Sequence, residues 1–256
     1  MTMIQGSFPI VKISLLAEKL YDLYVRCPVI ANTAKAGQFI LIRVEGFPLR
    51  RPIAVCEADR NSGILRLVFG IRGDGTKKLS QIGEGDWIDL LGPLGNGFEL
   101  LPGKKAVFVG GGLGVPPLLE AAKSYGSNAE AILGFQTDSQ VALRDDFQNH
   151  GVNATVMTDD GSQGRKGLVT DSLEELLARR HPDILYACGP LPMLKAVASI
   201  AAREKIRCQV LMEEKMGCGV GACHVCVCRT KRPEGGTVQS RVCSDGPVFE
   251  AERVVF

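Results

Sequence analysis

The chain has 256 residues, of which 30 are Lys or Arg and 28 are Asp or Glu, so its formal net charge is only +2. This balance gives no reason to expect a nucleic acid or a membrane surface as a partner. A hydrophobic content of 45% and a charged content of 23% are typical of a globular chain and exclude wholesale disorder. The length favours one or two domains by itself.

The N-terminal segment does not have the pattern of a signal peptide. It lacks a basic stretch before its apolar part, which itself contains a lysine. No apolar run in the sequence is long enough for a membrane-spanning helix. We therefore expect a cytoplasmic protein. Because that compartment is reducing, the nine cysteines favour metal binding or redox chemistry over disulfide bonds.

The first part of the chain predicts short β-strands separated by turns. Only one helix is expected there, over residues 77–82 and entered through Thr76. Several strands at this spacing are typical of a small barrel or sandwich, which we place at residues 1–101. The strands are bounded by Gly, Pro, Asp and Asn and are expected at residues 39–44, 53–56, 64–69 and 87–91.

After this region, strands alternate with helices. Such alternation predicts a parallel sheet with helices on both faces, which we place at residues 102–210. The remaining residues, 211–256, are rich in Cys and Gly and too short for a core of their own, so we expect a metal or cofactor to hold them. The expected strands are 106–109, 131–135, 154–158 and 184–187, and the expected helices are 116–124, 141–149, 172–180 and 192–204.

A cysteine motif near the C-terminus is the strongest signal in the sequence. Its spacing, C-x4-C-x2-C with a later single Cys, is the plant-type pattern for a [2Fe–2S] cluster. A structural zinc site is the alternative, but zinc ligands usually come as two C-x2-4-C pairs. The pattern therefore favours iron–sulfur, and glycines in the loop allow the backbone to direct N–H groups at the sulfurs. The predicted ligands are Cys218, Cys223, Cys226 and Cys243.

Two neighbours of this motif are not expected to be ligands. Cys228 follows Cys226 closely, and we interpret it as an inert thiol. His224 lies between two ligands and is interpreted as loop surface, since a Rieske-type cluster would need two His in place of two Cys.

A glycine-rich turn follows the first strand of the α/β region. Glycines allow a diphosphate to approach the backbone, and the following helix start favours its charge. Pro116 suits the first turn of that helix. The spacing is not G-x-G-x-x-G, so a plain tight turn between strand and helix explains it equally well. The candidate nucleotide-binding residues are Gly110, Gly111, Gly112 and Gly114.

Two further strand ends of this region carry candidate residues. Cys188 ends the last strand, where it would either lie beside a bound nicotinamide or be a small buried residue. Asp159 follows another strand, where a carboxylate would hold a ribose hydroxyl and favour NAD over NADP. For Asp160 an Asx-type turn is the better interpretation. The neighbouring cations Arg165 and Lys166 weaken the argument for NAD.

The barrel region contains two candidate anion sites. Arg50 and Arg51 precede a strand, where they would bind a phosphate or form a solvated basic edge. Gly75 and Thr76 open the short helix, and a helix start also favours an anion.

Taken in order, these motifs resemble the ferredoxin–NADP reductase superfamily with a C-terminal [2Fe–2S] domain. Within it, the sequence is most similar to one subfamily, the electron transfer subunits of class 1B dihydroorotate dehydrogenase. The similarity covers the whole chain and is most specific at residues 92–98, 110–118, 212–223 and 241–249.

The resemblance implies FAD in the barrel, NAD in the α/β domain and a cluster that faces an FMN-containing partner, which oxidises dihydroorotate. It also implies two copies of each subunit. By motif match, the residues around the flavin would be Arg51, Pro52, Ile53, Ala54, Val68, Phe69 and Gly70, with Gly75 and Thr76 on the pyrophosphate.

The sequence departs from this family at two positions. The family usually has Ser where this chain has Ala54, so a hydroxyl contact to the flavin is missing. It often has Arg where this chain has Gly70, and we expect Arg72, on the same strand face, to replace that cation.

From the sequence we predict an NAD-linked electron transfer subunit that works in pyrimidine biosynthesis, with dihydroorotate oxidation carried out by its partner. One alternative is a subunit of a sulfide dehydrogenase or of an electron-bifurcating NAD(P)H reductase. The other is a zinc-stapled binding module without enzymatic activity.

Overall fold

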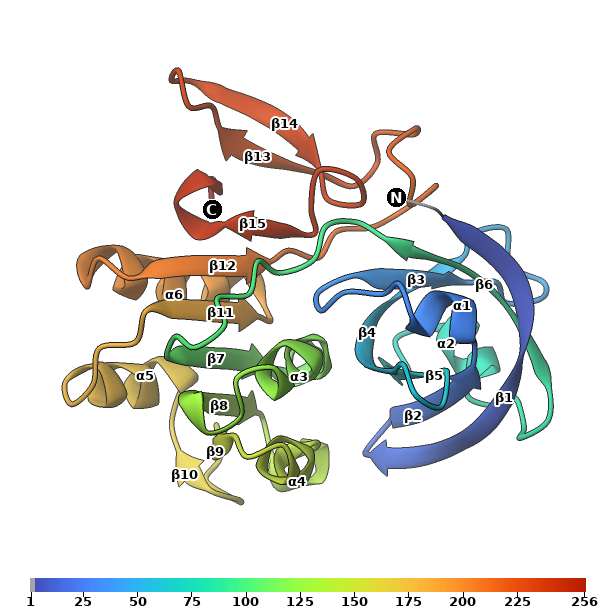
Figure 1. The fold of residues 1–256 in the computed structure, drawn as a ribbon, viewed down its shortest axis with the longest axis horizontal. Coiled ribbons are helices and arrows are strands. Elements are labelled where there is room, and N and C mark those ends of the chain that lie inside the picture. Colours follow the sequence, from blue (N-terminus) through green and yellow to red (C-terminus); the bar gives the residue numbers. More distant parts are fainter. Residues whose placement is uncertain (1–2) are drawn as a thin grey trace.

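The computed structural model describes residues 3–256, and Figure 1 shows a barrel beside a sheet covered by helices. The barrel is closed and antiparallel, with the strand order β1-β2-β5-β4-β3-β6. Two short helices, α1 (Pro28–Ala31) and α2 (Asp74–Leu79), accompany it. Its strands are β1 (Ile4–Ala17), β2 (Leu20–Arg26), β3 (Phe39–Ile42), β4 (Arg51–Asp59), β5 (Ile64–Gly70) and β6 (Trp87–Leu94).

Alternating apolar residues fill the barrel. Leu65 and Leu67 lie two residues apart on β5, and Leu67 pairs with Leu23 of β2. All three side chains are fully buried. Because side chains two apart point to one face of a strand, this alternation directs β5 into the core.

The barrel confirms the strands expected from residue 39 onward and adds β1 and β2, which the sequence pattern did not predict. The short helix also begins earlier than expected. Thr76 does not cap it from outside: it lies inside α2, where its Oγ accepts the N–H groups of Arg72 at 2.9 Å and Gly73 at 3.3 Å. The expectation of a helix entered through Thr76 was therefore wrong by about one turn.

The second unit is a seven-stranded sheet in the order β10-β9-β8-β7-β11-β12-β15. Its first six strands are parallel, as the alternation predicted, and β15 is antiparallel to β12. These strands are β7 (Ala106–Gly111), β8 (Ala129–Phe135), β9 (Asn153–Thr158), β10 (Arg165–Lys166), β11 (Ile184–Cys188), β12 (Arg207–Leu211) and β15 (Val248–Glu250).

Helices cover both faces of this sheet. The helices α3 and α4 lie on the face toward the barrel (Figure 1), and their apolar residues join barrel residues in one buried cluster. The helices α5 and α6 pack on the opposite face in a second cluster. Their bounds are α3 (Pro116–Lys123), α4 (Arg144–Asn149), α5 (Val169–Leu177) and α6 (Leu191–Arg203), and single 3-10 turns lie at η1 (Gly112–Gly114), η2 (Gly126–Asn128), η3 (Asp138–Gln140) and η4 (Ala251–Arg253).

The C-terminal segment combines a loop, a hairpin and a strand that joins the large sheet. The hairpin consists of β13 (Val227–Lys231) and β14 (Thr237–Arg241). After it, β15 pairs with β12, and the N–H of Met212 donates to the carbonyl of Pro247 at 2.9 Å. Sheet pairing thus fixes the segment at both ends, in addition to any group that the loop holds.

Candidate functional site

A cavity of about 260 Å³ opens between the barrel and the first turn of α3. It contains most of the residues predicted to surround the flavin. Residues from the segment after β12 complete it, among them Met212, Glu213 and Met216, which the sequence patterns did not assign to this wall. The predicted residues that line it are Arg51, Pro52, Ile53, Ala54, Val68, Phe69, Gly70 and Thr76.

The two arginines at the start of β4 have different partners. Arg50 forms a bidentate pair with Asp89 of β6, at 2.8 and 3.1 Å, so its charge is already paired within the barrel. Arg51 lines the cavity and lies over the ring of Phe47, 4.8 Å from the ring centre. Its guanidinium also covers Gly75, where an added Cβ would lie 2.3 Å from Nε. Arg51, not Arg50, is thus available for a phosphate.

The structure also describes the two positions that depart from the family pattern. Ala54 brings a methyl group to the cavity wall, at the position where the family resemblance implies a hydroxyl. Gly70 faces Leu113, since a Cβ on Gly70 would lie 3.1 Å from Leu113 Cδ1. A larger side chain at position 70 would have to displace this leucine. Arg72 lines the cavity, as its proposed role as the replacement cation requires. The expectation that it shares a strand face with position 70 was wrong, because β5 ends at Gly70 and Arg72 lies just beyond the strand.

A second cavity, of about 570 Å³, lies at the carboxyl ends of the parallel strands. Ligands of such sheets bind at this edge. Arg72, Leu113 and Glu213 line both cavities, so the two sites adjoin. Of the predicted nucleotide-binding residues, those in its wall are Gly111, Gly112, Gly114 and Asp159.

The glycine turn is shaped by close packing as well as by access to the cavity. A Cβ on Gly114 would lie 2.1 Å from the carbonyl oxygen of Cys188, so the turn packs directly on the end of β11. Gly110 does not line the cavity. It is buried in β7, where a Cβ would lie 2.9 Å from a methyl of Val115. The structure thus gives Gly110 a packing role, and its contact with a nucleotide stays a prediction.

The two aspartates of the loop after β9 have different surroundings. Asp159 lines the cavity, whereas Asp160 accepts the backbone N–H of Ser162 at 2.9 Å and its hydroxyl at 2.6 Å. These hydrogen bonds lower the pKa of Asp160 and form the expected Asx-type turn. Arg165 is paired with Glu175 at 2.7 Å, whereas Lys166 packs beside Gly161 of the same loop, where an added Cβ would lie 3.0 Å from Lys166 Cβ.

Cys188 is fully buried at the end of β11 and belongs to the core between the sheet and α3. Burial raises the pKa of its thiol well above the usual value, which keeps the sulfur protonated. This placement favours the alternative of a small buried residue. Its role beside a nicotinamide stays a prediction, and the following Gly189 and Pro190 are the residues that reach the cavity.

The cysteine loop directs backbone N–H groups at all four predicted ligands. Cys218 Sγ accepts from the N–H groups of Val220, Ala222 and Cys223, at 3.3–3.4 Å. Cys223 Sγ accepts from Cys218, Cys226 Sγ from Cys243, and Cys243 Sγ from Gly221. Such donors stabilise thiolates and tune a bound cluster.

The pKa values of the loop thiols reflect this environment. Burial raises the pKa of Cys218, but the backbone donors outweigh it and bring the value down to about 6. Burial raises the pKa of Cys243 to about 12. Cys228 lies half-buried in β13, and burial raises its pKa to about 11, which fits an inert thiol.

Two glycines shape the cysteine loop, which contacts β3 and β14. Gly219 and Gly221 have φ angles of +70° and +84°, a region that favours glycine. Gly219 also packs on Leu41 of β3, where a Cβ would lie 2.4 Å from a methyl. Arg241 donates to the carbonyl of Gly221 at 3.0 Å. His224 is exposed, as expected.

Within residues 3–256, no three His, Cys, Asp or Glu side chains are gathered as ligands of a single metal ion. The ligand assignment therefore rests on the cysteine spacing and on the N–H groups directed at the sulfurs. No helix in this part of the chain combines the length and the apolar character that a bilayer crossing requires.

Comparison with known proteins decides the family. Residues 213–255 match the model of the iron-sulfur cluster binding domain of dihydroorotate dehydrogenase B. The chain is also 44% identical to the electron transfer subunit of dihydroorotate dehydrogenase B (NAD(+)) from Caldanaerobacter subterraneus subsp. tengcongensis, over 86% of this chain and 87% of that protein. The chain belongs to this family of electron transfer subunits.

Other members of the family and a solved structure agree. The subunit from Bacillus caldolyticus is 43% identical over 94% of this chain and 95% of its own length. A solved NADH-dependent reduced ferredoxin-NADP oxidoreductase, studied for flavin-based electron bifurcation, is 33% identical, with a TM-score of 0.86 over 97% of this chain and 89% of that chain. The chain is thus an NAD-linked oxidoreductase subunit with FAD and iron–sulfur cofactors, as its sequence predicted, and the zinc alternative is discarded.

A more distant structure shares the fold. The cytochrome b5 reductase domain of Ulva prolifera nitrate reductase is 20% identical, with a TM-score of 0.65 over 79% of this chain and 94% of that chain. This likeness shows a shared fold over about four fifths of the chain.

Proposed function

We propose that this chain accepts electrons from the flavin of a dihydroorotate-oxidising subunit and delivers them to NAD+ in pyrimidine biosynthesis. The observation that carries the proposal is the continuity of three sites. Met216 lies in the wall of the flavin cavity, and the loop ligand Cys218 follows closely in the chain. On the other side, Leu113 and Glu213 line both the flavin and the nucleotide cavities.

The residues of the barrel and the loop hold the cofactors in this proposal. Arg51 binds the diphosphate of FAD beside Gly75 and Thr76, and Arg72 supplies a second cation. The apolar wall formed by Val68 and Phe69 lies along the flavin. The loop binds the cluster through Cys218, Cys223, Cys226 and Cys243. When bound, these groups supply the redox chemistry, since a cluster passes single electrons and a flavin exchanges one or two.

The residues of the second cavity hold NAD. The turn of Gly111, Gly112 and Gly114 allows its diphosphate to approach the backbone. Asp159 accepts a hydrogen bond from a ribose hydroxyl and repels a 2′-phosphate, which favours NAD over NADP. Arg165 is paired with Glu175, which leaves Lys166 as the cation of this loop that would weaken the preference for NAD.

The partner in this proposal is a catalytic subunit that carries FMN, in an assembly of two copies of each subunit located in the cytoplasm. The family name of the relatives supports a partner, since they are electron transfer subunits of a dehydrogenase. The exposed Cys223, between the exposed Val220 and Val225, supports an approach of that partner at the cysteine loop.

A second candidate is an electron transfer subunit of a bifurcating NADH-dependent reductase. The similarity to the solved ferredoxin-NADP oxidoreductase, which spans almost the whole chain, favours it. One experiment separates the two. The chain is purified from its native source together with bound proteins. The complex then receives either dihydroorotate with NAD+, or NADH and reduced ferredoxin with NADP+. NAD+ reduction by dihydroorotate supports the first candidate, and NADP+ reduction that requires both NADH and reduced ferredoxin supports the second.

A further inference from the structure

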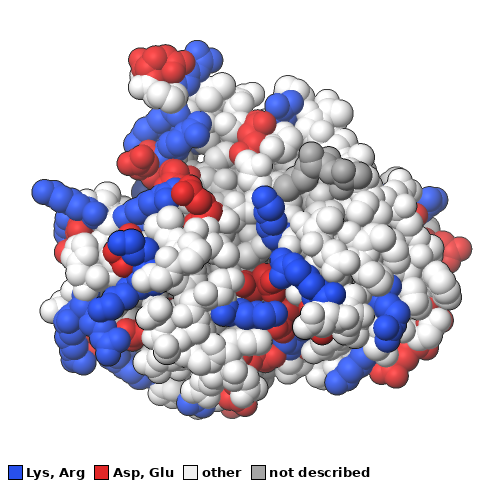
Figure 2. Space-filling view, viewed as in Figure 1, with Lys and Arg blue, Asp and Glu red and all other residues white. Residues whose placement is uncertain are grey.

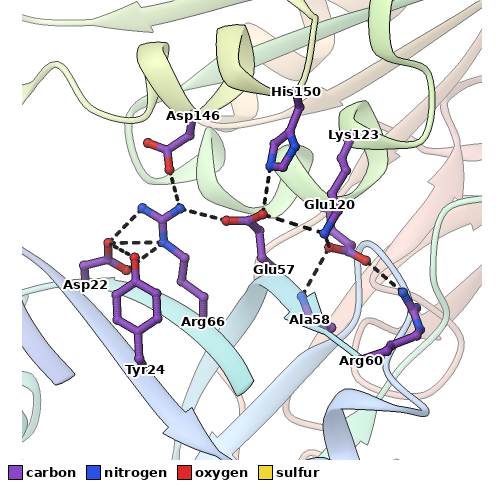
Figure 3. A network of polar contacts seen from close by, with 10 residues as sticks. All are labelled: Asp22, Tyr24, Glu57, Ala58, Arg60, Arg66, Glu120, Lys123, Asp146 and His150. Carbon is purple, nitrogen blue, oxygen red and sulfur yellow. Dashed lines mark hydrogen bonds and ion pairs between the residues drawn. The ribbon is translucent and has the colours of Figure 1, made fainter. Parts of the chain in front are cut away.

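A network of charged side chains crosses the junction between the barrel and the sheet domain (Figure 3). At its centre lies Arg66 of β5, which is 7% exposed. Its guanidinium donates to Asp22 of β2 at 2.8–3.1 Å and to Glu57 of β4 at 2.8 Å. It also donates to Asp146 of α4. A buried cation is stable only when it is paired with opposite charges. The carboxylates that pair with Arg66 come from both domains, so its guanidinium joins the barrel to the sheet domain.

Further contacts join the same surfaces, among them the ion pairs of Lys123 with Glu57 at 3.8 Å and of Arg60 with Glu120 at 3.4 Å. His150, which directly follows α4, lies with Nε2 2.9 Å from Glu57 Oε1. Glu120 of α3 accepts the backbone N–H of Ala58 in β4 at 3.2 Å. Figure 2 shows acidic and basic side chains side by side over this junction. We call Arg66, Glu57, Glu120, Asp146 and His150 the domain clamp.

The clamp lies on the same elements as the flavin cavity. Ala54 of β4 and Gly70 of β5 line the cavity, and Glu57 and Arg66 lie three and four residues from them. At a rise of about 3.3 Å per strand residue, these separations are about 10–13 Å. The helix α3 likewise carries Pro117 in the cavity wall and Glu120 in the clamp, less than one turn apart.

We propose that the domain clamp sets the angle between the barrel and the sheet domain and so places the nicotinamide against the flavin. Its members are positioning residues for hydride transfer, and this inference rests on the proposed function. The transfer moves one proton with two electrons between two rings, one held by each domain. It needs reacting atoms about 3–3.5 Å apart, and a misplacement of about 1 Å costs up to about 100-fold in rate.

The test removes the contacts of α4 and leaves both cavities unchanged. The double variant Asp146→Ala/His150→Ala loses the bonds to Arg66 and Glu57, while Arg66 keeps Asp22 and Glu57 inside the barrel. The matched control is Asp145→Ala/Gln148→Ala, which changes two exposed side chains of the same helix. The variant Asp146→Glu keeps the carboxylate and serves as the conservative rescue.

Two readouts are measured on the FAD-loaded protein. Rapid mixing with NADH gives the rate of flavin reduction, and hydrogen–deuterium exchange without nucleotide gives the protection of α4 and β4. The proposal predicts full FAD content, faster exchange of both elements and flavin reduction about ten- to 100-fold slower in the double variant. The control matches the unchanged protein, and Asp146→Glu recovers most of the rate.

Three outcomes overturn the proposal. Faster exchange with an unchanged rate of flavin reduction assigns the clamp a structural role only. Unchanged exchange and rate show that the contacts do not hold the domains. If the unchanged protein does not reduce its flavin with NADH, the proposed function fails and the inference falls with it. This last failure is recognised without any variant, whereas the first two appear only in the double variant.

Discussion

The guanidinium of Arg51 lies directly over Gly75, so close that a Cβ on this glycine would come within 2.3 Å of Nε. The contact joins the start of β4 to the short helix α2 and leaves Arg51 facing the flavin cavity. A glycine in a helix lowers stability by about 0.5–1 kcal/mol relative to alanine. Gly75 thus gives up some helix stability and leaves room for the guanidinium of Arg51.

Gly75→Ala is expected to weaken FAD binding without unfolding the barrel. The new methyl group displaces the flexible end of Arg51, which removes a charge-assisted contact of about 1.5–3 kcal/mol, or about ten- to 100-fold in affinity. Titration of the flavin-free protein with FAD measures the change. Gly73→Ala is the control, because a Cβ there meets no atom within 4 Å. Equal affinities for both variants would refute the assigned role of Arg51.

Ala54→Ser is expected to tighten FAD binding. The substitution returns a hydroxyl to the wall of the flavin cavity, and a hydrogen bond of this kind contributes about 0.5–1.5 kcal/mol. The same titration should show an affinity about two- to tenfold higher. A weaker affinity would mean that the apolar wall at this position suits the bound flavin better than a hydroxyl does.

Cys223→Ser is expected to abolish cluster binding, and Cys228→Ser is expected to preserve it. Both changes replace a sulfur in the same short segment, but only Cys223 shares backbone N–H contacts with Cys218. Because bound metal contributes to folding, the first variant should also lose protection in residues 213–255. Iron and sulfide assays with visible spectra measure the outcome. A full cluster in Cys223→Ser would contradict the ligand assignment.

Glu57 is expected to make stability depend on acidic pH. Burial raises the pKa of this carboxyl, but hydrogen bonds from Arg66 and His150 outweigh it and lower the pKa in the folded state. Glu57 thus contributes stability that is present above its unfolded pKa and is lost as the pH falls through the lower folded value.

The midpoint temperature of unfolding, measured between pH 7 and pH 3, checks this. It should fall with pH more steeply in the unchanged protein than in Glu57→Gln. Parallel slopes would show that the carboxylate is not held in this way.

Much of the fold follows from local patterns in the sequence, and the exceptions have physical reasons. Continuous apolar runs such as β7 and β11 predict buried parallel strands, and they are buried. The long strand β1 was not predicted because Ile10 is its one buried residue, so no clear alternation marks it. Its pairing with β2 and β6 is a tertiary effect.

The residues of the candidate site also fall into those that a local sequence motif predicts and those that it does not. Arg51 and its neighbours were predicted because one short motif carries them into the cavity together. Glu213 and Met216 reach the wall only because the chain returns past the barrel after β12, which no local pattern encodes. Arg66 resembles an exposed residue of a half-buried strand, and its partners Asp22 and Asp146 lie 44 and 80 residues away.

The central claim is that one chain joins an iron–sulfur site, a flavin site and a nicotinamide site. Its most direct test is anaerobic purification, with iron, sulfide, zinc and flavin measured on one sample, followed by addition of NADH to the same cuvette. We predict two irons, two sulfides and one FAD for each chain, and bleaching of the flavin band by NADH. Zinc in place of iron, or a flavin that NADH does not bleach, would contradict the account.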